Sequence, residues 1–168
     1  MRAYELNEGP QSRQIFCDMD GVLVDFELGI ELSYFEQNGQ RIKFHDLSDS
    51  EMWKTVNRAG EGWWFNLPWM PGGRQLWGII KKYKPIILTA PGQQKTCIPE
   101  KEAWVAQNLS PDLKVICDKD KWKYATPYRI LIDDTATKTI PWEEHGGIAI
   151  LHTNVSKTIK QLKKLGFK

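Results

Sequence analysis

The chain has 168 residues, of which 41% are hydrophobic and 26% are charged. These proportions are typical of a soluble globular protein and supply enough apolar side chains for one proper core. Lysine and arginine outnumber aspartate and glutamate by 23 to 21, which gives a formal net charge of +2. This small excess suits an anionic substrate but is too weak to indicate a nucleic-acid-binding protein by itself.

The three cysteines, Cys17, Cys97 and Cys117, have neither a CxxC pattern nor the spacing of a metal site. An odd number of cysteines, in a sequence that shows no signal peptide, indicates reduced thiols. The sequence also has no apolar run as long as a membrane span. We therefore expect a cytoplasmic protein that does not enter a membrane, and the sequence leaves open whether it is a monomer or a homodimer.

The first predicted strand covers residues 14–18 and follows a polar leader over residues 1–12. It ends in the segment CDMDGVLVDF, which contains Asp18, Asp20 and Gly21. Residues two apart share a face of a strand, so both aspartates are expected to converge at its carboxyl end. Neighbouring carboxylates repel unless a proton or cation lies between them, and Mg2+ prefers such oxygen ligands. A turn would also explain aspartate and glycine here, but it explains poorly two aspartates flanked by apolar runs.

A long segment, residues 26–71, separates this strand from the next and is predicted to form a helical, aromatic-rich cap. Connections inside compact domains are usually short, so a long insertion directly after a candidate site suggests a lid. Two helices are predicted in it, over residues 26–37 and 49–58, followed by a glycine-bounded aromatic loop. The core domain is then expected to comprise residues 1–25 and 72–168.

After the insert, helices and strands alternate regularly. Helices are predicted at residues 74–83, 100–109, 139–145 and 155–165, and strands at residues 85–89, 113–117, 128–133 and 147–151. Pro141 is expected in the first turn of its helix, where proline is tolerated. Apolar strands that alternate with helices indicate a parallel sheet covered on both faces. Ligands bind beyond the carboxyl ends of such strands, and three strands end in polar residues: Asp18, Thr89 and the pair Asp133 and Asp134.

The pair Asp133 and Asp134, taken alone, is explained about equally well by a helix N-cap and by a functional site. Asp18 changes this balance, because three or four carboxylates at one sheet edge destabilise one another without a cation. Mg2+ held by one or two carboxylates and by substrate phosphate oxygens is the expected solution.

The segment DMDGVLVDF resembles DxDGVL-x-D-F, the first motif of the haloacid dehalogenase-type phosphatases. The later segment IDDTATKTIPWEEHGGIAILHT is similar to their 5'(3')-deoxyribonucleotidase-like branch and is the more specific match. The resemblance implies a three-layer, Rossmann-like α/β core with a parallel five-stranded sheet in the order 5-4-1-2-3. It also implies Mg2+-dependent hydrolysis of (deoxy)nucleoside monophosphates through an aspartyl-phosphate intermediate.

The same resemblance implies a role for each acidic residue. Asp18 would be the nucleophile, and Asp20 the general acid and base. The Mg2+ ligands would be the Asp18 side chain, the Asp20 main-chain carbonyl and one member of the acidic pair. We prefer Asp134 as the direct ligand of the metal and Asp133 as a residue that supports the site without binding the metal, although the opposite assignment stays open.

Two further positions match the family's motifs. Thr89 stands where the second motif has a hydroxyl residue that contacts phosphate, although the hydroxyl residue that commonly follows is replaced here by Ala90. The third motif supplies a lysine that neutralises the nucleophile and the phosphate. Its spacing before the acidic pair selects Lys123, with Lys121 as the alternative.

The aromatic residues of the insert bear on the substrate. Four of them resemble the aromatic residues with which the branch holds a base: Phe26, Trp63, Trp64 and Phe65. Flat rings stack on nucleobases with about 1–3 kcal/mol per base, but several of these rings could instead form the interface between cap and core. A nucleoside monophosphate is the leading substrate. The alternatives are a polynucleotide 3'-phosphate or another small phosphomonoester, and a non-catalytic binding module comes last because all four motif positions are retained.

Overall fold

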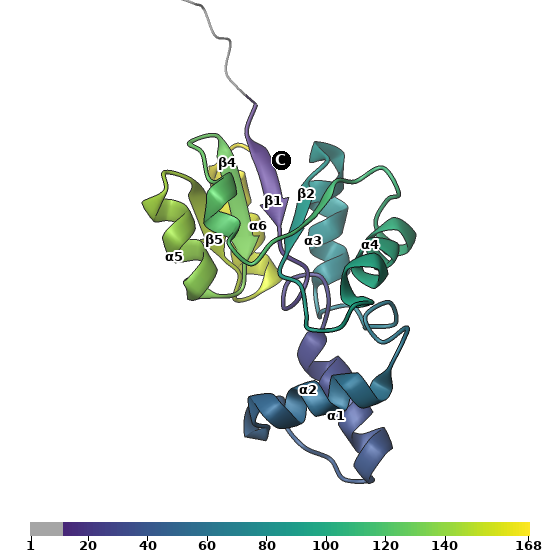
Figure 1. Ribbon diagram of the computed structural model, residues 1–168. Helices are drawn as coiled ribbons and strands as arrows, with labels where there is room; N and C mark the ends of the chain where they lie inside the picture. The colour runs from purple at the N-terminus through teal and green to yellow at the C-terminus, as the bar shows by residue number, and fades with distance from the viewer. Residues whose placement is uncertain (1–11) are drawn as a thin grey trace, which may run out of the picture.

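The computed structural model describes residues 12–168, so the predicted leader lies outside the described residues except for Ser12. Five parallel strands form one sheet in the order β3-β2-β1-β4-β5, as predicted (Figure 1). The strands are β1 Gln14–Cys17, β2 Ile86–Thr89, β3 Val115–Cys117, β4 Arg129–Asp133 and β5 Ile148–Leu151. Their apolar runs need cover on both faces, which explains the three-layer α/β fold.

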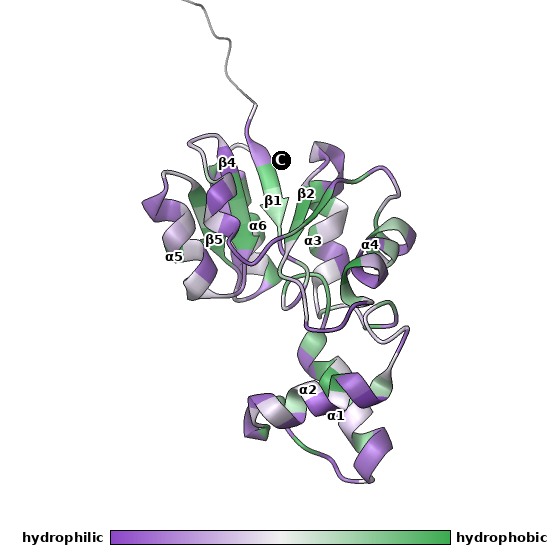
Figure 2. Ribbon diagram, in the orientation of Figure 1, coloured by the Kyte–Doolittle hydropathy of each residue, from purple (hydrophilic) through white to green (hydrophobic). Residues whose placement is uncertain are grey.

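Alternate side chains of the strands pack on opposite faces of the sheet. On one face the core includes Ile15, Ile87 and Ile132, and it continues into α3 (Gly73–Ile80), α4 (Cys97–Asn108) and α6 (Val155–Lys164). On the other face Phe16, Leu88 and Leu131 pack with Trp142 of α5 (Ala136–Glu144). Figure 2 shows the largely hydrophobic strands of the sheet between helices in which hydrophilic and hydrophobic residues are mixed.

Most elements lie where the sequence predicts them, but α5 begins earlier than expected. Its first residue is Ala136, so Pro141 lies in the interior of the helix and not in its first turn, which corrects the prediction. A proline ring removes one N–H donor from a helix. The next residue, Trp142, is fully buried against the sheet, and this packing anchors the turn that contains the proline.

The insert between β1 and β2 contains α1 (Phe26–Asn38), the short 3-10 helix η1 (Phe44–Asp46) and α2 (Asp49–Ala59). These helices form a lobe beyond the carboxyl ends of the strands (Figure 1). The two connections to the core lie side by side, because Val24 pairs with Trp69 in an antiparallel bridge. Among the described helices, none combines the length and apolar character that crossing a membrane requires.

Candidate active site

A tight turn directly after β1 places the first two aspartates. The Met19 carbonyl accepts hydrogen bonds from the N–H groups of Val22, Leu23 and Val24, at 3.1, 2.9 and 2.9 Å. Gly21 in this turn has a φ of +80°, a conformation that favours glycine. A side chain at Gly21 would also overlap the Asp134 carboxylate. The turn therefore brings the backbone after Asp18 into contact with the end of β4.

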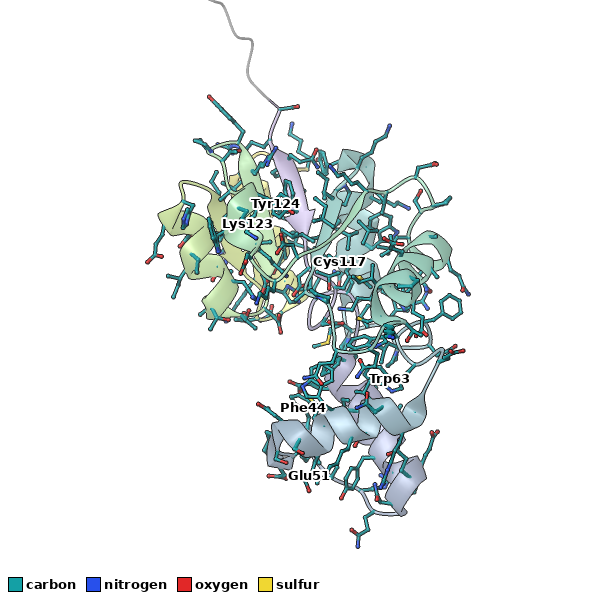
Figure 3. All side chains as sticks on the ribbon, in the orientation of Figure 1. Phe44, Glu51, Trp63, Cys117, Lys123 and Tyr124 are labelled. Atoms are coloured by element: carbon teal, nitrogen blue, oxygen red, sulfur yellow. The ribbon has the colours of Figure 1, made fainter. Side chains whose placement is uncertain are left out.

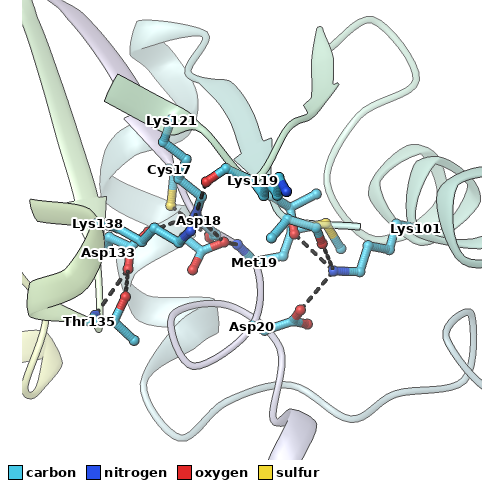
Figure 4. A network of polar contacts seen from close by, with 12 residues as sticks. Cys17, Asp18, Met19, Asp20, Lys101, Lys119, Lys121, Asp133, Thr135 and Lys138 are labelled. Carbon is cyan, nitrogen blue, oxygen red and sulfur yellow. Dashed lines mark hydrogen bonds and ion pairs between the residues drawn. The ribbon is translucent and has the colours of Figure 1, made fainter. Parts of the chain in front are cut away.

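Lys121 links the ends of the two central strands. Its ammonium lies 2.8 Å from Asp18 Oδ1 and 2.6 Å from Asp133 Oδ2, and the side chain is only 2% exposed (Figure 4). The other Asp133 oxygen accepts hydrogen bonds from Thr135, from its N–H at 3.0 Å and its hydroxyl at 2.9 Å. Asp133 is therefore fully engaged by protein donors, and it holds Lys121 against Asp18.

Lys123, the lysine that the sequence favours, lies outside this cluster. It is 47% exposed and pairs with Asp120 at 3.1 Å and Asp118 at 3.7 Å (Figure 3). Both lysines belong to the 3-10 helix η3 (Lys121–Tyr124). Such a helix has three residues per turn, so residues two apart point in different directions. The prediction that Lys123 lies beside Asp18 is wrong, and Lys121, the alternative, occupies that place.

Three carboxylates gather at the carboxyl end of the sheet. One oxygen from each of Asp18, Asp133 and Asp134 lies within 4.8 Å of the others. Burial raises the pKa of Asp18 to about 7, and Lys121 offsets this only in part. Burial and then Asp133 raise the pKa of Asp134 to about 6. Burial alone would lower the pKa of Lys121, but Asp18 and Asp133 raise it above its ordinary value. One lysine therefore does not balance the negative charge of the cluster.

A second buried lysine, which the sequence reading missed, lies on the other side of the turn. The Lys101 ammonium donates to Asp20 Oδ2 at 2.7 Å, to Thr89 Oγ1 at 2.9 Å and to the Ala90 carbonyl at 2.9 Å (Figure 4). A pattern in the sequence could have revealed it. The residues of α4 that are buried are Cys97, Lys101, Trp104 and Val105, a spacing that marks the inward face of a helix.

Thr89 is placed differently from the prediction. Its side chain is fully buried, and its hydroxyl accepts the hydrogen bond from Lys101. It shares a sheet face with Ile87, two residues earlier, which packs in the core on the same side as α4. Its neighbour Ala90 lines the cleft, whereas Thr89 is not among the described residues that do. The predicted direct contact of Thr89 with a phosphate is not supported by this placement.

A cleft of about 310 Å³ lies between the sheet edge and the insert. Its floor carries Asp18, Asp20, Lys121 and Asp134, and its wall on the insert side carries aromatic rings. The remaining lining residues are Gly21, Asp25, Phe26, Glu27, Phe44, Met70, Ala90, Thr135 and Lys138. The site therefore carries carboxylates and a lysine at the sheet edge, and aromatic rings with two acidic side chains, Asp25 and Glu27, toward the insert.

The four predicted aromatic residues have different positions. Phe26 lines the cleft, while Trp63, Trp64 and Phe65 are outside the set of described residues that line it. Trp63 and Trp64 pack edge to face at 4.8 Å, and Phe26 stacks on Trp64 at 5.6 Å. The indole N–H of Trp64 donates to Gln94 of the core at 3.2 Å. Trp63 and Trp64 therefore pack between the insert and the core, the alternative that the sequence left open, whereas Phe26 lies at the cleft as expected.

Phe44 is an aromatic residue of the cleft that the sequence reading missed. It packs edge to face on Phe26 with their ring centroids 5.9 Å apart. It belongs to η1, a single turn that follows an irregular segment, so no periodic pattern in the sequence marks it. Figure 3 shows Phe44 and Trp63 in separate parts of the insert.

Comparisons with known proteins agree with the fold. No protein-family model and no curated protein sequence matches the chain. A hydrolase from Streptococcus pneumoniae TIGR4 superposes with a TM-score of 0.59 at 11% identity, over 90% of this chain and 98% of that chain. A HAD family hydrolase from Deinococcus radiodurans R1, solved with bound phosphate and sodium, gives 0.58 at 9% identity, over 82% and 79% of the two chains.

The L-2-haloacid dehalogenase from Xanthobacter autotrophicus gives a TM-score of 0.54 at 11% identity, over 92% of this chain and 83% of that chain. At such low identities, the likeness concerns the fold. The chain therefore has the fold of the haloacid dehalogenase-like hydrolases, as the first motif implied.

Proposed function

We propose that the chain is a phosphomonoester hydrolase that acts on nucleoside monophosphates, with Asp18 as nucleophile. The observation that carries this proposal is the ion pair of Asp18 with the buried Lys121, on the floor of a cleft that also holds Asp20 and Asp134. A carboxylate can attack phosphorus and form a covalent intermediate. The lysine beside it offsets the charge on the transferring group, which is the main contribution of a protein to phosphoryl transfer.

The reaction then has two halves. In the first, an Asp18 oxygen attacks phosphorus, the bond from phosphorus to the leaving oxygen breaks, and Asp20 gives that oxygen a proton to form an alcohol. In the second, a water molecule attacks the phosphoryl group on Asp18 and gives a proton to Asp20. Inorganic phosphate leaves, and Asp18 is again a carboxylate.

The acidic cluster fits a magnesium ion. Asp133 is occupied by Lys121 and Thr135, so the side chains of Asp18 and Asp134 are the ones that would hold the ion. The Asp20 main-chain carbonyl is the third ligand that the family resemblance implies. When bound, the ion would neutralise charge on the carboxylates and on the phosphate oxygens.

The shape of the cleft supports a nucleotide substrate. Its volume of about 310 Å³ lies within the range of small-molecule sites. Phe26 and Phe44 offer aromatic surface to a base while the phosphate lies at the carboxylates. On the insert side the rim carries Asp25 and Glu27, which repel further phosphates and favour a mononucleotide over the end of a polynucleotide.

A phosphatase explains the site better than a dehalogenase. A halide ion leaves without a proton, so a dehalogenase has no need for Asp20 as an acid or for a cation between Asp18 and Asp134. Lys121 alone does not balance the three carboxylates, so their proximity would be costly in a protein that binds no cation. The clustered carboxylates therefore favour phosphoryl transfer.

A substrate panel tests the proposal. Deoxynucleoside monophosphates, sugar phosphates, 3'-phosphorylated oligonucleotides and 2-chloropropionate would be assayed for release of phosphate or chloride, with Mg2+ and with a chelator. We expect phosphate release from mononucleotides when Mg2+ is present and none when the chelator is present. Asp18→Asn should abolish it, while Lys95→Met, which changes an exposed lysine, should retain it. Near-wild-type activity of Asp18→Asn, or release of chloride alone, would contradict the proposal.

A further inference from the structure

Lys101 and Asp20 form an ion pair whose lysine has no part in the reaction described above. The Lys101 side chain is 1% exposed, whereas that of Asp20 is 28% exposed. Lysine is rarely buried unless its charge is paired. Its two other hydrogen bonds go to Thr89 and Ala90, so all three N–H donors of the ammonium are used. The ammonium is therefore fixed by three acceptors from two different segments.

Contacts from the insert hold this lysine in place. The ammonium of Lys101 lies over the Trp64 ring, 4.8 Å from the ring centroid. The adjacent residue, Glu100, accepts hydrogen bonds from the N–H groups of Gly62 at 2.8 Å and of Trp64 at 3.0 Å. These bonds tie α4 to the aromatic loop. Asp20 is thus held against a cation that has little freedom to move.

We propose that Lys101 is a positioning residue that fixes the orientation of the Asp20 carboxyl group at the cleft; this inference rests on the proposed function. Oδ2 of Asp20 accepts from Lys101 at 2.7 Å. Oδ1 of Asp20 is buried and finds no hydrogen-bond partner within residues 12–168. Lys101 is therefore the side chain among these residues that fixes the orientation of the Asp20 carboxyl group, which lines the cleft.

The fixed carboxyl group serves both halves of the reaction. Asp20 gives a proton to the leaving oxygen as the bond to phosphorus breaks, and it later takes a proton from the attacking water. General acid–base catalysis contributes roughly 10²–10⁴-fold. A misplacement of about 1 Å can cost about 100-fold. An Asp20 carboxyl that is free to rotate would therefore lose much of this contribution.

Lys101→Met tests the inference, because methionine fills similar space without the charge. The kcat/KM values would be measured for benzyl phosphate and p-nitrophenyl phosphate, two esters of similar size. The benzyl alkoxide needs a proton to leave, whereas p-nitrophenolate does not. We expect the variant to lose about 30-fold or more on benzyl phosphate and less than about 3-fold on p-nitrophenyl phosphate. Partial unfolding lowers both values equally and leaves their ratio unchanged.

Two further variants complete the experiment. Asp20→Asn should show the same dependence on the leaving group. Adding Lys101→Met to Asp20→Asn should lower kcat/KM by less than about 3-fold further, because the carboxyl group that Lys101 positions is already absent. Lys95→Met is the matched control and should change neither value. Equal losses on both esters, a gain of activity, or full additivity with Asp20→Asn would overturn the inference while the proposed function stands. A wild-type protein that hydrolyses no phosphoester overturns both.

Discussion

At the scale of single residues, Lys121 is the side chain on which the site depends. It pairs with Asp18 and Asp133 while nearly all of its surface is buried. A buried charge that loses its partner is strongly destabilising, whereas an exposed pair contributes little. Lys121 therefore stabilises the fold at the same point at which it would assist the proposed reaction.

Lys121→Met and Lys123→Met form a matched pair that separates the two lysines. The first change leaves Asp18 and Asp133 unpaired, so we expect a loss of about 3–5 kcal/mol in the free energy of unfolding and about 10²-fold or more in kcat. The second removes an exposed charge and should leave activity within about 3-fold of the wild type. Urea denaturation and phosphate release measure both effects. Equal losses in the two variants would contradict this assignment.

The acidic residues of the site were predictable, but the lysines were predictable only in part. Asp18, Asp20 and the pair Asp133 and Asp134 follow apolar strands, and the ends of neighbouring parallel strands meet at one edge of the sheet. Lysines are usually exposed, so composition gives no reason to choose a buried one. The single turn of 3-10 helix that contains both lysines determines that Lys121, and not Lys123, points toward Asp18.

At the scale of elements, strands and helices were predicted better than the loops between them. The strands are continuous apolar runs and the helices have clear signals, such as the Ser48 and Glu51 capping box of α2. The aromatic loop has no such signal. The sequence alone does not distinguish an aromatic residue that stacks on a base from one that packs between two parts of a protein. The packing of Trp63 and Trp64 is therefore known only from the structure.

A substitution of Phe44 in η1 tests whether the insert binds a base. We expect Phe44→Ala to raise the KM for a deoxynucleoside monophosphate by about 5-fold or more, because stacking contributes about 1–3 kcal/mol per base. The KM for glycerol phosphate, which has no base, should change little. Phe35→Ala is the control, since Phe35 is in the same lobe and 45% exposed. Steady-state kinetics with both substrates measure the effect, and a similar rise in both KM values would argue against stacking.

At the scale of the whole molecule, we expect the acidic cluster to couple folding to pH and to a bound metal ion. The pKa of Asp18 is raised from 3.8 to about 7, so between these values the folded protein binds more protons than the unfolded chain does. Stability without metal should therefore fall as the pH rises through this window. The raised pKa of Lys121 adds stability that is lost only at a much higher pH.

Magnesium should reverse this loss. The ion binds charged carboxylates and competes with protons, so we expect Mg2+ to raise the melting temperature more at about pH 8 than at about pH 5.5. Thermal unfolding in Mg2+ and in chelator, at both pH values, measures the difference. Asp134→Asn, which removes a proposed ligand, should reduce the effect of Mg2+. An equal effect of the ion at both pH values would show that the carboxylates are not its ligands.

The paired connections of the insert have an evolutionary consequence. The Asp25 N–H donates to the Pro68 carbonyl and the Met70 N–H to the Leu23 carbonyl, both at 2.8 Å, so the chain leaves the core and returns to it at one point. A short hairpin turn in place of the whole lobe would leave the sheet continuous. Lobes of other sizes can therefore be exchanged by recombination at this junction. Under the proposed function, such an exchange would change the substrate preference and leave the carboxylates beneath it in place.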